Sequence, residues 1–273
     1  MENREGLDFL HNVVKDNSVD LILTDPPYVI SHNTGLNDQY VSVRSKGDQN
    51  MKTEEDWEKY KETNQKKFSE KQKENFLKYG TIYGKKYAVS TDYGDWDHTF
   101  TMDTLDAFVR AFYKKLRKGG TLILWFDLWK VSHLKDIMES AGFKQIRMIE
   151  WIKTNPQPLN ASVNYLTNCR EIALTGVKDG KPTFNGRMER GIYEYPMASG
   201  KLKFHPTQKN LQLFEELIGK HSNENDLVMD TFLGGGTTAY AAFNTGRRFT
   251  GCEANKEYFE RLKTNLKTIG CSW

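Results

Sequence analysis

The sequence predicts an α/β protein built on a doubly wound, mostly parallel sheet. Two observations support this fold class. Short β-rich apolar runs alternate with segments of helical periodicity along most of the 273 residues, and a Gly-rich turn joins one such run to a helical segment near the C-terminus. A chain of this length can bury a sizeable core within one large domain.

The N-terminal part begins with a short predicted helix over residues 7–15. Residues 19–24 read VDLILT, a compact β-rich run that is typical of a strand buried on both faces. Pro26 and Pro27 stop this strand, because proline lacks a backbone N–H and restricts the residue before it. The strand therefore leads directly into the turn Asp25-Pro26-Pro27-Tyr28.

Residues 30–95 differ in character from the segments around them. They are polar and rich in lysine, with nine lysines and three glutamates between Lys59 and Lys86. Part of this stretch, about 54–78, has a thin apolar stripe that could support helix. We interpret 30–95 as an inserted, partly flexible segment. Its lysines could contact DNA phosphates, line a protein partner or form a solvated surface.

Regular structure is predicted again from Met102 onward. Apolar spacing predicts a helix over 103–117, ended by Lys118-Gly119-Gly120. The elements that follow, in order, are a buried strand at 121–126, a helix at 131–141, strands at 146–152 and 170–176, a loop at 177–203, a helix at 207–219, a strand at 226–231, a helix at 237–245, a strand at 248–252 and a helix at 255–267.

Composition sets limits on the location and partners of the protein. The formal net charge is only +3, so any nucleic-acid surface must be local. Three widely spaced cysteines without a C-x-x-C pair predict neither a zinc site nor a disulfide framework. The charged N-terminus and the absence of a long apolar run predict a cytoplasmic or host-cell internal protein with no membrane partner, and the cysteine spacing indicates no metal partner.

The Gly-rich turn Asp230–Thr238 (DTFLGGGTT) has the features of a ligand-binding loop. Its glycines let the backbone approach a ligand, and the following helix can present N–H groups to it. Glu253 ends the next strand, where an acid in doubly wound folds accepts hydrogen bonds from ribose hydroxyls. Residues 234–239 also fit the loose dinucleotide pattern, but Asp230 would repel a diphosphate. A ligand with an ammonium and a sulfonium suits this turn better, which favours S-adenosylmethionine.

The turn Asp25-Pro26-Pro27-Tyr28 suits chemistry on an aromatic amino group. The lone pair of such a nitrogen is delocalised into the ring, which makes it a poor nucleophile. Asp25 and the Pro26 carbonyl can accept its two hydrogens and free that lone pair, and Pro27 helps to fix the backbone. Tyr28 can stack on a base flipped out of the helix.

These segments together resemble the amino-methyltransferases of DNA. The resemblance covers most of the chain. Because the catalytic tetrapeptide precedes the cofactor loop, it is similar to the beta group, whose target-recognition segment lies between the two. It rests on the stretches VDLILTDPPY, LRKGGTLIL, GFKQIRMIEWIKTNP, HPTQKN and VMDTFLGGGTTAYAA.

The resemblance implies a seven-strand-type methyltransferase (Rossmann-like) sheet and a role for each matching residue. Thr207 and Lys209 would lie near the cofactor carboxylate, and Glu5 or Asp8 would be candidates for its adenine pocket. The implied catalytic residues are Asp25, Pro26, Pro27 and Tyr28, and the implied cofactor-binding residues are Asp230, Phe232, Gly234, Gly236, Thr237, Glu253, His205, Thr207 and Lys209.

The expected activity is transfer of a methyl group from S-adenosylmethionine to adenine N6 in DNA. Asp25 favours adenine over cytosine N4, because the cytosine members more often carry serine there. Transfer to a ring carbon would need a cysteine preceded by proline, a pattern that the sequence lacks. A non-catalytic DNA-binding subunit and a nicotinamide-dependent oxidoreductase are two rival functions. Residues 177–203, basic and interleaved with aromatics, are the candidate target-recognition segment, and the beta group also implies a homodimer.

Overall fold

The computed structural model describes residues 1–27, 52–64, 68–79, 82, 100–156, 167–199, 204–205, 207–268 and 270. The chain divides into two units, Met1–Val29 with Phe100–Trp273, and Ile30–Thr99.

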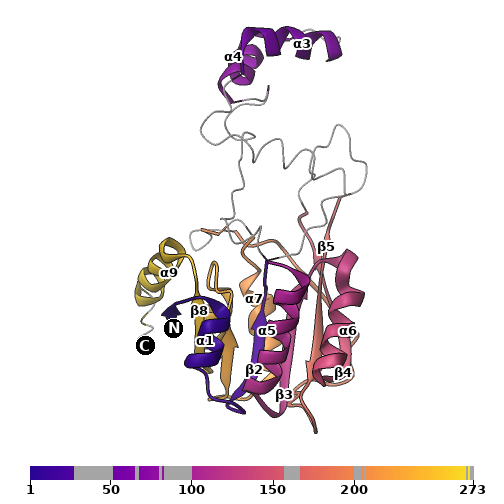
Figure 1. Ribbon diagram of the computed structural model, residues 1–273, viewed down its shortest axis with the longest axis vertical. Helices are drawn as coiled ribbons and strands as arrows, with labels where there is room; N and C mark the ends of the chain where they lie inside the picture. Colours follow the sequence, from indigo (N-terminus) through magenta and orange to yellow (C-terminus); the bar gives the residue numbers. More distant parts are fainter. Residues whose placement is uncertain are drawn as a thin grey trace. The chain divides into compact units, whose positions relative to one another are not determined.

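The larger unit is built on one twisted sheet with eight strands in its described residues (Figure 1). Neighbouring strands are parallel except around β5, which is antiparallel to both β3 and β4. The predicted mostly parallel α/β sheet is therefore confirmed. From one edge to the other the strands are β1 (Glu2–Asn3), β8 (Arg248–Glu253), β7 (Leu227–Asp230), β2 (Val19–Thr24), β3 (Leu116–Phe126), β5 (Arg170–Val177), β4 (Lys144–Lys153) and β6 (Ile192–Tyr195).

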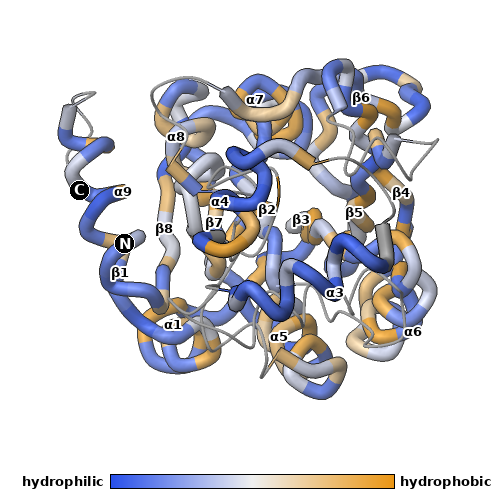
Figure 2. The backbone as a smooth tube through the Cα atoms, turned by 90° about the horizontal axis from the view of Figure 1, so that it is seen from above, coloured by the Kyte–Doolittle hydropathy of each residue, from blue (hydrophilic) through white to orange (hydrophobic). Residues whose placement is uncertain are grey.

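Helices cover both faces of this sheet, as a doubly wound fold requires (Figure 2). One apolar layer contains Phe9, Phe108 and Phe112, and the other contains Trp125 and Phe214. The strands contribute to both layers, which explains why β2 and β3 read as nearly continuous apolar runs. The helices on one face are α1 (Gly6–Asn12), α5 (Met102–Lys115) and α6 (Val131–Ala141), those on the other are α7 (Leu211–His221) and α8 (Thr237–Asn244), and α9 (Lys256–Thr268) lies beside β8 and β1.

The prediction that Lys118-Gly119-Gly120 ends a helix is wrong. Helix α5 ends at Lys115, and Leu116 already has extended backbone angles and begins β3. Gly119 lies inside that strand at φ +77°, with its N–H directed to the carbonyl oxygens of Lys178 and Asp179. The glycine therefore accommodates an irregularity in the strand, where the pairing with β2 changes register.

The predicted loop at 177–203 contains a strand that the sequence analysis missed. Ile192–Tyr195 forms β6 and pairs in parallel with β4 at the edge of the sheet. Tyr193 is buried between two more exposed neighbours, an alternation too short to stand out in four residues. A short 3-10 helix, η3 (Leu128–Lys130), follows β3.

In its described residues the smaller unit contains two helices, α3 (Glu54–Asn64) and α4 (Glu70–Tyr79). The helical expectation for about 54–78 is thereby confirmed in its main part. Trp57, Phe76 and Ile82 form a small core, with ring centroids of Trp57 and Phe76 5.3 Å apart. The apolar residues of the thin stripe therefore pack against one another within this unit. The contact of the lysines between Lys59 and Lys86 with DNA stays a prediction.

Candidate active site

The predicted functional segments meet at the edge of the sheet where its parallel strands end. Asp25 follows β2, the Gly-rich turn follows β7, and Glu253 ends β8, and these three strands are neighbours. Strand β5 runs in the opposite direction, so its first residues lie at this edge, and Glu171 pairs with Trp151 near the end of β4. Open α/β sheets bind ligands at this edge because the loops that leave the strands converge there.

A buried cation holds the Asp25 carboxylate. Lys209 Nζ lies 2.7 Å from Asp25 Oδ2 and 2.7 Å from Glu171 Oε2, and the Lys209 side chain is only 7% exposed. Pro26 is buried beside Asp25, so packing as well as the proline ring fixes the turn. The resemblance implies that Lys209 lies near the cofactor carboxylate, but here its ammonium binds the predicted catalytic turn.

Glu171 connects Lys209 to a second lysine. Lys153 Nζ lies 2.6 Å from Glu171 Oε1, and Lys209 binds the other oxygen of the same carboxylate. Burial favours the protonated form of Glu171, but the nearby charges of Lys209 and Lys153 outweigh it and lower the pKa to about 2. Glu171 is therefore an anion throughout the physiological pH range.

Asp230 connects the Gly-rich turn to the end of β2. Its Oδ1 accepts hydrogen bonds from Thr24 Oγ1 at 2.6 Å and from the Phe232 N–H at 3.0 Å, and its Oδ2 accepts one from Thr238 Oγ1 at 2.7 Å. Burial raises the pKa of Asp230 to about 6, although these hydrogen bonds oppose the shift. The carboxylate thus fixes the turn from inside, between the end of β2 and the start of α8.

Glu253 forms an acceptor site inside the Gly-rich turn. The side chain is 2% exposed, and its two oxygens accept the N–H groups of Gly234 and Asn255, each at 2.8 Å. Burial raises the pKa of this carboxyl, while the backbone N–H groups act against the shift. A carboxylate offers about four lone-pair positions, more than the backbone N–H groups occupy, so it can also accept from a ribose hydroxyl. The residues present therefore fit the ribose of S-adenosylmethionine.

Residues 205 and 207–209 lie against the same turn. His205 faces Gly234, whose missing side chain would lie 3.6 Å from the imidazole ring, and Gly234 itself has φ +46°. Thr207 Oγ1 lies 3.1 Å from His205 Nδ1, and Thr237 Oγ1 donates to the Lys209 carbonyl at 3.4 Å. Burial, with a smaller contribution from Lys209, lowers the pKa of His205 to about 4, so the imidazole is neutral near pH 7.

Helix α7 begins later than predicted, at Leu211 rather than at 207. Asn210 caps it, because its side-chain oxygen accepts the Leu213 N–H at 2.9 Å. The same side chain donates to the Pro196 carbonyl at 3.0 Å. The Asn210 side chain therefore starts the helix and ties the segment to the chain that follows β6.

Not every predicted residue lies in this cluster. Phe232 packs its ring on Phe108 of α5, with centroids 4.8 Å apart, although its N–H reaches Asp230. Tyr28 lies outside the described residues. Glu5 caps α1 through the N–H groups of Leu7 and Asp8, and the Asp8 carboxylate binds Arg4 and Asn12. The structure brings together Asp25, Pro26, Pro27, His205, Thr207, Lys209, Asp230, Gly234, Gly236, Thr237 and Glu253.

Four polar residues of this cluster were not predicted as site residues. They are the charged pair Lys153 and Glu171 and the hydroxyls Thr24 and Thr238. Thr24 directly precedes Asp25 and Thr238 ends the Gly-rich turn, and these positions could have identified them. Glu171 gives a weaker signal, because a charged residue at the start of a strand is ordinary unless that strand is known to be antiparallel.

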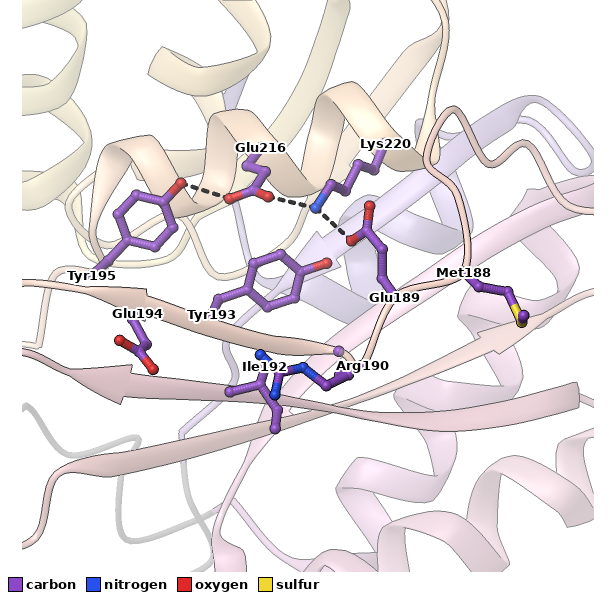
Figure 3. A pocket seen from close by; sticks show the side chains of 10 residues that line it. Met188, Glu189, Arg190, Ile192, Tyr193, Glu194, Tyr195, Glu216 and Lys220 are labelled. Atoms are coloured by element: carbon purple, nitrogen blue, oxygen red, sulfur yellow. Dashed lines mark hydrogen bonds and ion pairs between the residues drawn. The ribbon is translucent and has the colours of Figure 1, made fainter.

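A separate pocket of about 510 Å³ lies between β6 and α7 (Figure 3). Tyr195 donates to Glu216 Oε2 at 2.6 Å, and Lys220 Nζ binds both Glu216 and Glu189. Figure 3 shows these side chains directed toward one another rather than toward a free centre. The pocket is formed largely by residues of the candidate target-recognition segment, at 188–195.

Two free cysteines lie among the described residues, Cys169, which is half-buried, and Cys252, which is buried. Burial raises the pKa of the Cys252 thiol, which lies 3.6 Å from the Thr231 carbonyl. The part of the chain that the structure describes contains no group of three His, Cys, Asp or Glu side chains arranged for a metal ion. Among the same residues, no helix is long and apolar enough to cross a membrane.

Replacing Thr231 by valine should stabilise the protein. Thr231 is 3% exposed, and its hydroxyl has no hydrogen-bond partner among the described residues. Valine keeps the shape and removes a buried polar group, so we expect a gain of about 1 kcal/mol in the free energy of unfolding. Urea denaturation measures this value. Thr24→Val is the matched control, because it removes a hydroxyl that is bonded to Asp230 and should destabilise; a loss of stability in Thr231→Val as well would contradict the prediction.

Comparisons of the sequence and of the structure with known proteins both find DNA methyltransferases. The sequence matches the DNA methylase family of N6/N4 type over residues 19–264. It is 32% identical to the type II methyltransferase M2.LlaDCHI of Lactococcus lactis subsp. cremoris, over 65% of this chain and 73% of that protein. It is 31% identical to the type II methyltransferase M2.DpnII of Streptococcus pneumoniae, over 66% and 74% of the two chains. The crystal structure of the M1.HpyAVI–SAM complex aligns with a TM-score of 0.59 and 26% identity, over 95% of this chain and 92% of that one.

Proposed function

Because this chain belongs to the N6/N4 family of DNA methylases, we propose that it transfers a methyl group from S-adenosylmethionine to the N6 nitrogen of adenine in DNA. One observation carries this proposal. The Asp25-Pro26 turn and the Gly-rich turn leave adjacent parallel strands, and Thr24 and Asp230 join them through a 2.6 Å hydrogen bond. A methyl acceptor at the first turn and a methyl donor at the second would therefore be neighbours.

The residues after β2 would activate the amino group. An exocyclic amino group has two hydrogens and a lone pair conjugated with the ring. The Asp25 carboxylate and the Pro26 carbonyl would accept those two hydrogens, which favours tetrahedral geometry at nitrogen and makes the lone pair available. As the nitrogen forms its bond to the methyl carbon, the bond between that carbon and the donor sulfur would break, and its electron pair would stay on sulfur as a neutral thioether. The positive charge would thereby pass to the nitrogen, and the negative charge of Asp25 would stabilise it until one proton is lost to water.

The residues after β7 and β8 would hold the cofactor. S-adenosylmethionine, when bound, supplies an electrophilic methyl group on a positively charged sulfur. Glu253 would accept the ribose hydroxyls, and Gly234 and Gly236 would keep the backbone close to the ligand. A side chain at Gly236 would come within 2.1 Å of Leu262, so this turn needs glycine for packing as well. His205 and Thr207 would face the cofactor across Gly234.

Asp25 supports adenine as the target, because the cytosine members of the family more often have serine at that position. The decisive assay incubates DNA with the purified chain and S-adenosylmethionine and then analyses the nucleosides by mass spectrometry. We expect N6-methyladenine. N4-methylcytosine in its place would overturn the choice of base, and the absence of both would overturn the activity and favour a non-catalytic subunit.

The binding partners proposed for this chain follow from the same family. Residues 177–203 would contact the target sequence, and their described part includes the exposed Met188 and the basic Arg187 and Arg190. We further propose a homodimer that acts in the cytoplasm of a bacterium or a phage-infected host, without a metal ion. Light scattering on the purified protein tests the dimer, and a monomer at assay concentration would exclude it.

A further inference from the structure

Four charged side chains form an alternating row at the catalytic edge of the sheet. The order is Lys153, Glu171, Lys209 and Asp25, and the three successive nitrogen–oxygen distances are 2.6, 2.7 and 2.7 Å. The exposed fractions of these side chains lie between 7% and 21%. The charges balance, two positive and two negative, so the row can be buried without an excess charge.

Aromatic rings pack against both lysines of this row. Lys209 Nζ lies 5.6 Å from the centre of the Trp125 ring, and Lys153 Nζ lies 5.5 Å from that of Trp151. Trp125 and Trp151 are buried and contact each other edge to face. Each ammonium group is therefore held both by a buried indole ring and by carboxylate oxygens, which limits its movement.

We propose that Glu171 is a positioning residue for the methyl transfer, because it shares the Lys209 ammonium with Asp25 and thereby fixes the Asp25 carboxylate. The inference rests on the catalytic role proposed above for Asp25. Glu171 does not contact the reacting atoms; it acts through Lys209. Lys153 binds Glu171 Oε1, the oxygen that Lys209 does not contact, and is the last member of the row.

The sharing has a chemical consequence for Asp25. If Glu171 were neutral, the full attraction of the Lys209 ammonium would fall on the Asp25 carboxylate, which would become a weaker acceptor for the amino hydrogens. Lys153 and Lys209 would also be left as two buried positive charges with a single carboxylate in the row, that of Asp25, which binds Lys209. Both effects lower the rate of the chemical step, whereas neither touches the Glu253 side of the site.

Glu171→Gln and Glu150→Gln test this proposal as a matched pair. Glu150 lies on the neighbouring strand β4 with 22% exposure against 20% for Glu171, but its cation is the exposed Arg170. Single-turnover rates of methyl transfer are measured with saturating DNA and cofactor, and calorimetry gives the cofactor Kd. We expect Glu171→Gln to lose about tenfold in rate with an unchanged Kd, and Glu150→Gln to match the wild type. Equal rates in the two variants would overturn the proposal.

A thermodynamic cycle separates this inference from the proposed function. Asp25→Asn, Glu171→Gln and the double variant are unfolded in urea, with Glu150→Gln in place of Glu171→Gln as the control cycle. We expect the Asp25–Glu171 cycle to be non-additive by about tenfold in the unfolding equilibrium constant, because only the double variant leaves Lys209 without both carboxylates. The control cycle should be additive. Additivity in both cycles overturns the proposal even if the chain methylates DNA, and non-additivity supports the coupling even if it does not.

A conservative variant distinguishes the loss of the Glu171 charge from a general disruption of the fold. Glu171→Asp keeps the negative charge but has a shorter side chain, so its rate should lie between those of the wild type and Glu171→Gln. A Glu171→Asp protein that is as slow as Glu171→Gln would show that a negative charge on residue 171 does not restore the rate, which would also overturn the proposal.

Discussion

Asp25→Asn should lower the rate of methyl transfer on the order of 10³-fold while the protein stays folded and binds its cofactor. Asparagine matches aspartate in size but has no negative charge to offset the positive charge that develops on the amino nitrogen. Its amide also presents N–H groups where an acceptor is required. In this variant Lys209 keeps its ion pair with Glu171, at 2.7 Å, so the buried ammonium still has a carboxylate partner. Single-turnover transfer of a labelled methyl group measures the effect.

Asp20→Asn is the control for this experiment. Asp20 lies at the other end of β2, where its carboxylate binds Arg117 and accepts the Leu227 N–H at 2.7 Å. Its replacement should lower stability and leave the rate constant of transfer within about twofold, because it is far from the reacting edge. Turnover by Asp25→Asn comparable to that of Asp20→Asn would contradict the mechanism.

Glu253→Gln should weaken the binding of S-adenosylmethionine by about 30-fold. The charged carboxylate accepts two backbone N–H groups and would also accept ribose hydroxyls, whereas the amide has only one acceptor oxygen. A hydrogen bond to a charged group contributes about 2 kcal/mol, which corresponds to this change in Kd. At saturating cofactor the rate should recover, because Glu253 lies on the binding side of the site. Isothermal calorimetry gives the Kd directly.

Glu215→Gln serves as the matched replacement for this measurement. Glu215 on α7 binds the Asn244 side chain at 2.6 Å and belongs to neither turn. Its cofactor affinity should equal that of the wild type. An unchanged Kd in Glu253→Gln would remove Glu253 from the ribose site, and a Kd that rises equally in both variants would point to a general loss of stability.

Local patterns predicted much of the fold. The run VDLILT gave the bounds of β2 correctly, because two prolines end it and a strand buried on both faces has a distinctive composition. The boundary between α5 and β3 was misplaced, since a glycine pair usually ends a helix but here lies within a strand. Strand β6 was missed because its backbone pairing with β4, rather than its own four residues, makes it a strand.

The candidate site was predictable where one motif carries its own chemistry. The sequence indicates Asp25, Glu253 and the Gly-rich turn through residue type and position after a strand. Glu171 could not be found in this way, because only the reversed direction of β5 brings the beginning of that strand to the edge where the others end. The partner of Lys209 was unexpected for the same reason. A short motif does not specify which distant carboxylate its lysine binds.

The place of β2 in the sheet also affects how the protein must be made. One neighbour, β3, is encoded soon after the inserted unit, but the other, β7, comes from the far end of the chain, and the Thr24–Asp230 bond joins residues 206 positions apart. Ribosomes synthesise roughly 5–20 residues per second, so β2 leaves the ribosome about ten seconds or more before β7 is made. During this interval the backbone edge of β2 that later pairs with β7 has no partner strand. A strand in that state is a template for wrong pairing with other nascent chains. Because the site is assembled from both halves of the sequence, the growing chain passes through an interval of synthesis in which it is most prone to aggregation.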